Sequence, residues 1–276
     1  MKHKKMWWIV GFVCLLIVCL WACDARMKVV HYETETEKIQ NPVRIALITD
    51  FHSCDYGENQ NVLMEALHEQ KPDVVLLGGD IFEDKRAHTD AEELLSVLSK
   101  QYPCYYVTGN HEYWSEEIET ILGFFQKYHV TVLAGDCVTV DVRGQKFNLC
   151  GVDDPDVEVY TDAKKGFYEQ LKKASESADP ALFIVLLAHR PERIGTYREY
   201  GFDLVLSGHA HGGQWRLPGV INGVYAPHQG VFPKYAGGSY EFDNGTRMIV
   251  SRGLARETTI IPRIFNRPEL VIIDLK

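Results

Sequence analysis

The chain has 276 residues, of which 46% are hydrophobic and 11% aromatic, so it can bury the core of one large globular domain or two small ones. Its net charge of -9 argues against a general nucleic-acid-binding protein, because affinity for phosphate backbones comes from clustered Lys and Arg. A solvated acidic surface explains most of the excess of Asp and Glu, and carboxylates that hold cations would add to it. We therefore expect a globular protein that binds no nucleic acid.

The first element in chain order is a membrane-directed segment. An uncharged apolar stretch runs from Met6 to Cys23 after the basic start MKHKK, at the lower edge of the roughly 17 to 25 residues that a spanning helix needs. A retained anchor and a cleaved signal peptide are both open, and LWAC at 20–23 resembles a lipoprotein cleavage box in which Trp21 is unusual. Since basic residues are more numerous before the stretch than after it, the positive-inside rule places the rest of the chain outside the cytoplasm. We expect a single-pass N-terminal anchor at the cell membrane, with secretion or lipid anchoring as alternatives.

The rest of the chain divides into a polar segment and a main domain. Residues 1–26 are the anchor or signal segment, 27–41 a linker or edge strand, and 42–276 the main domain. Helix patterns lie at 62–67, at the capping-box pair Thr89 and Glu92, and after Ser115. Short apolar, β-branched runs predict buried strands at 43–50, 73–80, 104–110, 130–135, 146–152, 182–189, 203–209, 247–253 and 269–275. This order favours sheets covered by helices, with a mixed sheet late in the chain.

Four cysteines lie outside the apolar stretch: Cys54, Cys104, Cys137 and Cys150. Zinc held by thiolates is disfavoured, because no CxxC spacing occurs. Four cysteines allow two disulfides in an oxidising compartment, but the spacing assigns no pairing. We expect isolated buried cysteines.

Five of the predicted strands end in side chains that can bind metal ions. One such ending is more often a turn residue or a helix cap, but strand ends of a layered α/β fold converge on one edge. The mixture of carboxylate, imidazole and amide groups without thiolate suits Mn, Fe or Zn. Seven or eight ligands are too many for one tetrahedral zinc and fit two ions roughly 3.5 to 4 Å apart that share a carboxylate. The residues are Asp50, His52, Asp80, Asn110, His111, His189, His209 and His211.

This series resembles the calcineurin-like metallophosphoesterase family in order and spacing. The matching blocks are DFH at 50–52, GGD at 78–80, GNHE at 109–112, AH at 188–189 and GHAH at 208–211. The following GGQWRLPG and the closing RIFNRPELVIIDL are similar to a membrane-associated or exported bacterial branch. The resemblance implies that the metallophosphoesterase domain at 42–276 has an α/β fold, a four-layer αββα sandwich of two mixed sheets flanked by helices.

The resemblance also implies two divalent metal ions, with Mn, Fe or Zn favoured. The first ion would be held by Asp50, His52, Asp80 and His211. The second would be held by Asp80, Asn110, His189 and His209, so that Asp80 is shared. His111 matches the family's catalytic histidine, which would protonate the leaving group, and Glu112 would orient it. Asn110 would also donate an amide hydrogen bond to a phosphate oxygen, and the metals would activate a hydroxide for attack at phosphorus.

These features predict a membrane-tethered, metal-dependent phosphoric ester hydrolase that acts on a phosphodiester or pyrophosphate. The expected partner is a phosphate-containing small molecule or a lipid-linked or wall-linked compound at the membrane. The resembling family includes enzymes that cleave a nucleotide-diacylglucosamine lipid precursor. That substrate is made in the cytoplasm, which conflicts with the expected topology, so it remains an alternative. A non-catalytic, metal-stabilised binding module is a further alternative, against which the complete ligand set weighs.

Three further signals are weaker. Asp153 and Asp154 precede Pro155, and a turn explains them better than a place in the site. Trp215 and Arg216 follow the metal loop, where they either hold part of a substrate or pack the loop. His228 in APHQG matches no ligand position, and among the remaining histidines it is the one to reconsider.

Overall fold

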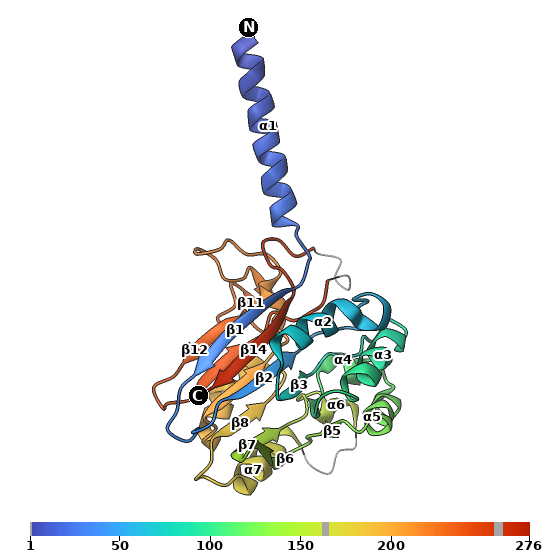
Figure 1. Cartoon of the computed structure of the whole chain (residues 1–276), viewed down its shortest axis with the longest axis vertical. Helices are drawn as coiled ribbons and strands as arrows, with labels where there is room; N and C mark the ends of the chain where they lie inside the picture. The colour runs from blue at the N-terminus through green and yellow to red at the C-terminus, as the bar shows by residue number, and fades with distance from the viewer. Residues whose placement is uncertain (1, 162–165, 257–261) are drawn as a thin grey trace.

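A long helix and a layered body make up the computed structural model, which describes residues 2–161, 166–256 and 262–276 (Figure 1). Helix α1 (Lys2–Ala22) extends away from the body, as Figure 1 shows. Its 18-residue segment Lys5–Ala22 is long and apolar enough to cross a membrane, although a signal sequence passes the same test. Only 6% of this segment is buried, so the described body leaves the apolar sides of α1 uncovered.

The described residues form two six-stranded mixed sheets. The first has the order β1 (Lys28–Thr34), β14 (Glu269–Leu275), β2 (Val43–Ile48), β3 (Val74–Gly78), β4 (Cys104–Val107) and β5 (Thr131–Val132). The second has the order β12 (Gly238–Glu241), β13 (Arg247–Val250), β9 (Leu204–Ser207), β8 (Ile184–Leu187), β7 (Gln145–Gly151) and β6 (Asp136–Val142). The central strands are parallel and buried on both faces, which explains their continuous apolar runs. A hairpin pairs β10 (Tyr225–Ala226) with β11 (Gly230–Val231).

Helices cover the outer face of each sheet, and the two inner faces pack together around side chains such as Ile45, Leu47 and Phe147. The helices against the first sheet are α2 (Asn61–Gln70), α3 (Thr89–Leu98) and α5 (Ile118–Lys127). Those against the second are α7 (Phe167–Ser177) and α8 (Ile194–Tyr197). Shorter helices are η1 (Glu58–Gln60), α4 (Asn110–Trp114), α6 (Val157–Tyr160), η2 (Pro191–Arg193), η3 (Arg198–Tyr200) and η4 (His211–Gly213). The predicted αββα sandwich is confirmed.

Each of the nine predicted apolar runs contains a strand. The segment 27–41, left open as linker or edge strand, contributes β1, which pairs in parallel with β14 along its whole length. The folded body therefore begins before Pro42. Strands β6 and β12 were not predicted, because exposed polar residues interrupt both strands and neither includes a continuous apolar run.

Two predicted helix starts are wrong. Thr89 does not cap α3, since His88 occupies the cap position and makes no side-chain capping hydrogen bond. Ser115 ends α4 instead of starting the next helix, and α5 begins at Ile118. Within α2, which covers the predicted helix pattern at 62–67, Val62 is 48% exposed. The three helices themselves are present, and Leu63, Leu95 and Phe125 are among their buried residues.

Cys137 and Cys150 form a disulfide between β6 and β7, so the expectation of isolated cysteines is wrong for this pair. The two residues lie directly opposite each other in neighbouring antiparallel strands, the arrangement in which side chains approach most closely. Because β6 was not predicted, their spacing of 13 residues did not indicate this contact. Cys54 and Cys104 are buried elsewhere in the core.

Replacing both Cys137 and Cys150 with serine is expected to lower the free energy of unfolding by about 3 kcal/mol, because a disulfide that closes a loop of this length restricts the unfolded chain. Denaturant unfolding of the full chain in detergent measures the difference. Reductant should bring the wild-type protein to the same midpoint and leave the double variant unchanged. An identical midpoint for oxidised and reduced wild-type protein would show that the bond contributes no stability.

Candidate metal centre

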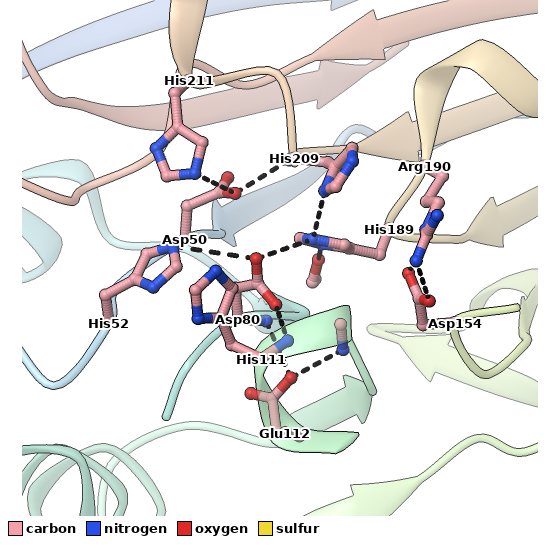
Figure 2. A network of polar contacts seen from close by, with 12 residues as sticks. Asp50, His52, Asp80, His111, Glu112, Asp154, His189, Arg190, His209 and His211 are labelled. Atoms are coloured by element: carbon pink, nitrogen blue, oxygen red, sulfur yellow. Dashed lines mark hydrogen bonds and ion pairs between the residues drawn. The ribbon is translucent and has the colours of Figure 1, made fainter. Parts of the chain in front are cut away.

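The metal-capable side chains lie on loops at the carboxyl ends of parallel strands from both sheets (Figure 2). The first sheet supplies the two carboxylates, the asparagine and two of the histidines, and the second sheet supplies the remaining three histidines. Asp50 and His52 follow β2, Asp80 follows β3, Asn110 and His111 begin α4 after β4, His189 follows β8, and His209 and His211 follow β9. The convergence expected from the strand ends therefore occurs.

Two groups of possible ligands meet at Asp80. In the first, ligand atoms of Asp50, His52, Asp80 and His211 all lie within 4.8 Å of one another. In the second, the same holds for Asp80, His189 and His209. The Oδ2 atom of Asp80 is 3.7 Å from His52 Nε2 and 3.0 Å from His189 Nε2. The structure thus gathers the predicted residues into two adjoining clusters with one shared carboxylate.

The donor atoms fit divalent cations. His52 Nε2 and Asn110 Oδ1 are buried and have no hydrogen-bond partner. A buried polar atom without a partner is costly, and a cation that accepts a lone pair from each of them would remove this cost. Carboxylate, imidazole and amide donors without thiolate suit ions such as Mn, Fe or Zn.

Five of the predicted ligands have left-handed backbone conformations. Their φ angles are 49° for Asp50, 51° for His52, 51° for Asp80, 66° for His209 and 47° for His211. This conformation is uncommon for residues other than glycine and costs about 1–3 kcal/mol at each position. Such strain clusters at functional sites, where it aims side chains in directions that a regular strand or helix cannot provide. The loops therefore position these side chains at the expense of local stability.

Two motif glycines are required by close contact with the carboxylates. A Cβ atom at Gly109 would lie 2.2 Å from Asp80 Oδ1, and one at Gly208 would lie 2.5 Å from Asp50 Oδ2. Neither distance is physically accessible, so any side chain there would displace a predicted ligand. The glycines in GNHE and GHAH thus let neighbouring loops approach the two carboxylates.

Backbone amides hold the loops in place. Asp80 Oδ1 accepts a hydrogen bond from the amide of His111 at 2.9 Å, and Asp50 Oδ1 accepts one from the amide of His209 at 2.8 Å. The carboxylate of Glu112 accepts hydrogen bonds from the amides of Asp80, Ile81, Phe82 and Gly109. Glu112 therefore joins the GGD loop to the GNHE loop, which differs from the expectation that it orients the His111 ring.

Glu83 and Asp84, which the sequence analysis missed, contact the His111 ring instead. His111 Nδ1 is 2.8 Å from Asp84 Oδ1 and 3.4 Å from Glu83 Oε1. Glu83 also lies 2.5 Å from His52 Nδ1. Burial opposes the charged form of His111, but the carboxylates of Asp80 and Glu83 raise its pKa to about 10. The run GDIFED after β3 carried a signal for these residues, because it places two more acids directly after Asp80.

A chain of polar contacts extends from His209 to the protein surface. His209 Nε2 is 2.9 Å from His228 Nδ1, and His228 Nε2 is 3.2 Å from an amino group of Arg190. Arg190 donates two hydrogen bonds of 2.7 Å to Asp154, as Figure 2 shows. Asp154 also accepts a bond from the amide of Asp156, which agrees with the predicted turn. His228 and Arg190 thus fix the orientation of the His209 ring, as outer contacts do for metal-binding histidines.

Metal binding at pH 8 is expected to release about one proton from His189, because a ligand nitrogen must be unprotonated. Burial opposes its charged form, yet the Asp80 carboxylate raises the pKa of His189 from 6.5 to about 10. In the metal-free protein this ionisation stabilises the fold fully below pH 6.5, and the contribution is lost as the pH rises through 10. Titration calorimetry in two buffers of different ionisation enthalpy counts the protons.

The matched comparison for this proton count is His189→Gln, which cannot carry the proton. The variant should release about one proton fewer than the wild-type protein at pH 8. Equal proton counts for the two proteins would exclude His189 as the group that metal displaces.

Comparison with known proteins assigns the family. Residues 43–213 match the calcineurin-like phosphoesterase family, and this range contains every predicted ligand. The chain belongs to this family. An uncharacterized metallophosphoesterase of Helicobacter pylori is 32% identical to this calcineurin-like phosphoesterase over 77% of the chain, which spans 57% of that relative's length. The phosphodiesterase YaeI of Escherichia coli is 28% identical over 85% of the chain and 82% of its own length.

Two solved structures share the fold of this calcineurin-like phosphoesterase. The NAD nucleotidase of Haemophilus influenzae has a TM-score of 0.52 and 17% identity, over 78% of this chain and 46% of its own. A 5'-nucleotidase precursor from Thermus thermophilus has a TM-score of 0.51 and 15% identity, over 78% of this chain and 50% of its own. At such identities the similarity concerns the fold alone.

Proposed function

We propose that the chain is a membrane-tethered phosphoesterase that uses two divalent metal ions to hydrolyse a phosphodiester or pyrophosphate bond. The observation that carries this proposal is the pair of ligand groups that share Asp80. A shared carboxylate is the usual bridge of a two-metal centre, in which the ions stabilise both the attacking and the leaving oxygen. The relative named phosphodiesterase supports a diester over a monoester.

The residues divide the chemistry between binding and proton transfer. Bound divalent ions would lower the pKa of a water molecule and neutralise charge that develops on the phosphoryl oxygens. The carboxylates of Asp80 and Glu83 raise the pKa of His111 to about 10, which favours the protonated ring. Its Nδ1 lies 2.8 Å from Asp84 Oδ1, so Nε2 would donate the proton to the leaving oxygen. The ring lies against that of His52, with 4.5 Å between their centres, so this proton is delivered next to the metal ligands. The Asn110 amide would donate a hydrogen bond to a phosphoryl oxygen.

The membrane tether rests on α1 and on the charge around it. The uncovered apolar segment Lys5–Ala22 supports an anchor, and the lysines before it support a body outside the cytoplasm. The Cys137–Cys150 disulfide agrees with this topology, because disulfides persist in oxidising compartments. An envelope phosphate compound is therefore favoured over a nucleotide-activated lipid precursor made in the cytoplasm.

Hydrolysis by the full chain in detergent micelles tests the activity. The protein is stripped of metal, resupplied with Mn, Zn or Fe, and offered an aryl phosphodiester and the matching monoester. We expect metal to restore hydrolysis, with the diester cleaved faster. If no metal restores turnover although two ions bind to each chain, the phosphoesterase proposal is wrong and a binding module takes its place.

A further inference from the structure

The stretch that follows the metal-binding loop exposes several large apolar side chains. Outside α1, the described residues contain eleven such side chains with high exposure, and six of them lie within 18 consecutive positions. Their exposed fractions run from 47% to 75%. They are Trp215, Leu217, Val220, Tyr225, Val231 and Phe232. A concentration of this kind marks an interaction surface, and we refer to residues 214–235 as the docking loops.

The docking loops are joined to the base of α1. The carbonyl of Ala22 at the end of α1 accepts a hydrogen bond of 2.7 Å from the amide of Phe265. The rings of Trp21 and Phe265 pack edge to face with 5.1 Å between their centres. The neighbouring Ile264 forms a bridge with Trp215 in the docking loops. The docking loops and α1 therefore lie at one end of the body, where Figure 1 also shows them.

The candidate metal centre lies towards this same end. Strand β1 begins at Lys28, six residues after the last residue of α1, and pairs there with Glu269 of β14. Strand β14 runs antiparallel to β2, so the start of β14 lies beside the end of β2. The start of β1, which pairs with the start of β14, is therefore level with the end of β2, where Asp50 follows. Asn266 donates a hydrogen bond of 2.7 Å to the carbonyl of His211. The ligand-bearing strand ends thus face the direction in which α1 leaves the body.

Basic side chains surround a cavity between α1 and the docking loops. The cavity has a volume of about 250 Å³, and its lining contains three basic residues and no acidic one: Trp21, Lys28, Arg216, Pro218, Phe265 and Arg267. Lys28 pairs with Glu269 at 3.4 Å, and Arg267 lies 3.5 Å from Asp24. Burial lowers the pKa values of Lys28 and Arg216 although the charge of Glu269 opposes this shift. An anionic headgroup at the cavity would stabilise their charged forms. Aromatic and basic side chains together are typical of the water interface of a membrane.

We propose that the docking loops bind the surface of an anionic lipid bilayer, with their apolar side chains in the headgroup region and the metal centre held against the membrane. This inference rests on the proposed membrane tether. It adds an orientation of the folded body relative to the bilayer, because α1 alone provides one point of attachment. A bilayer is favoured over a protein partner because α1, whose apolar sides are uncovered, brings this end of the body to the membrane. The substrate class that fits is an amphiphile whose phosphate lies at the bilayer surface.

A fluorescent label placed on the docking loops tests the proposal. The full chain carries Cys14→Ser, Cys19→Ser and Cys23→Ser, and a new label site from Val231→Cys. The matched control is Val159→Cys on α6. Val159 is 75% exposed, and Val231 is 65% exposed. Figure 1 shows that α6 lies far from α1. Both proteins carry nitrobenzoxadiazole and are reconstituted in phosphatidylcholine vesicles with phosphatidylglycerol. We expect blue-shifted emission and quenching by headgroup nitroxide lipid at position 231, and neither at position 159.

Vesicle flotation separates the possible failures. If the chain floats with the vesicles but aqueous iodide quenches both labels equally, the docking surface is wrong and the tether stands. If the chain does not float, the tether and the docking surface are both wrong, whereas hydrolysis of a soluble diester remains a separate result. Vesicles without phosphatidylglycerol should give a smaller shift at position 231, and an equal shift would contradict the requirement for anionic lipid.

Discussion

Replacing Asp80 with asparagine is expected to lower metal content and to reduce kcat/KM at least about 100-fold, a loss that even outer contacts of metal ligands can produce. Asp80 belongs to both ligand groups, so both proposed ions lose a negatively charged donor at once. Asparagine has nearly the same shape and keeps an acceptor for the His111 amide, which bonds to Asp80 Oδ1. Elemental analysis and hydrolysis of an aryl phosphodiester, on protein purified in the same way, measure the two effects.

The matched control for this experiment is Asp274→Asn. Asp274 is also a buried aspartate, and it pairs with Arg44 on β2 far from both ligand groups. The control should retain metal and activity, although its stability falls. An Asp80→Asn protein that binds two ions and turns over at the wild-type rate would exclude Asp80 as the shared ligand.

Removing the His111 ring with His111→Ala is expected to lower kcat by about 10² to 10⁴, the usual contribution of a general acid, with metal content unchanged. His111 belongs to neither of the two groups that share Asp80, and Asp84 and Glu83 hold its Nδ1. The role as proton donor predicts a specific pattern. The loss should be large for an alkyl leaving group, which needs a proton, and small for p-nitrophenolate, which does not.

His88→Ala is the matched control for His111→Ala, since His88 is also a histidine paired with a carboxylate but lies outside the ligand groups. It should leave turnover near the wild-type value for both leaving groups. An equal loss for the two leaving groups in His111→Ala would argue against proton donation. A loss of metal as large as in Asp80→Asn would make His111 a ligand.

The central strands were predictable because a strand that is buried on both faces consists of a continuous run of apolar residues. Strands β3 and β8 show this most clearly, with every residue buried. Strands at the edges of the sheets lack that signal, since β12 has no fully buried residue and was missed. The disulfide was missed for the same reason, because the position of Cys137 opposite Cys150 depends on β6. Edge strands are fixed by their neighbours in the sheet more than by their own residues.

The identity of the predicted ligands could be inferred from the sequence, but their backbone conformation and their contacts could not. The spacing of the motifs indicated Asp50, Asp80 and the histidines, because these side chains end strands that meet at one edge. It did not indicate the left-handed backbone at five of them, which depends on loops from both sheets. His228 was singled out among the remaining histidines, but the motifs assigned it no role. It lies 19 residues after His209 in the sequence and contacts it only through the return of the chain.

The division of the predicted ligands between the two sheets has a consequence for folding kinetics. Asp50, His52, Asp80 and Asn110 come from loops of the first sheet, and His189, His209 and His211 from loops of the second. The full set of donors therefore exists only after the two sheets have packed together. A cation that binds this set stabilises the native state. It does not stabilise the transition state for folding if the two sheets have not yet packed together there. Added metal should therefore slow unfolding many-fold while leaving the rate of refolding almost unchanged. Bound ions would then raise the barrier to separating the two sheets only after the sheets have packed.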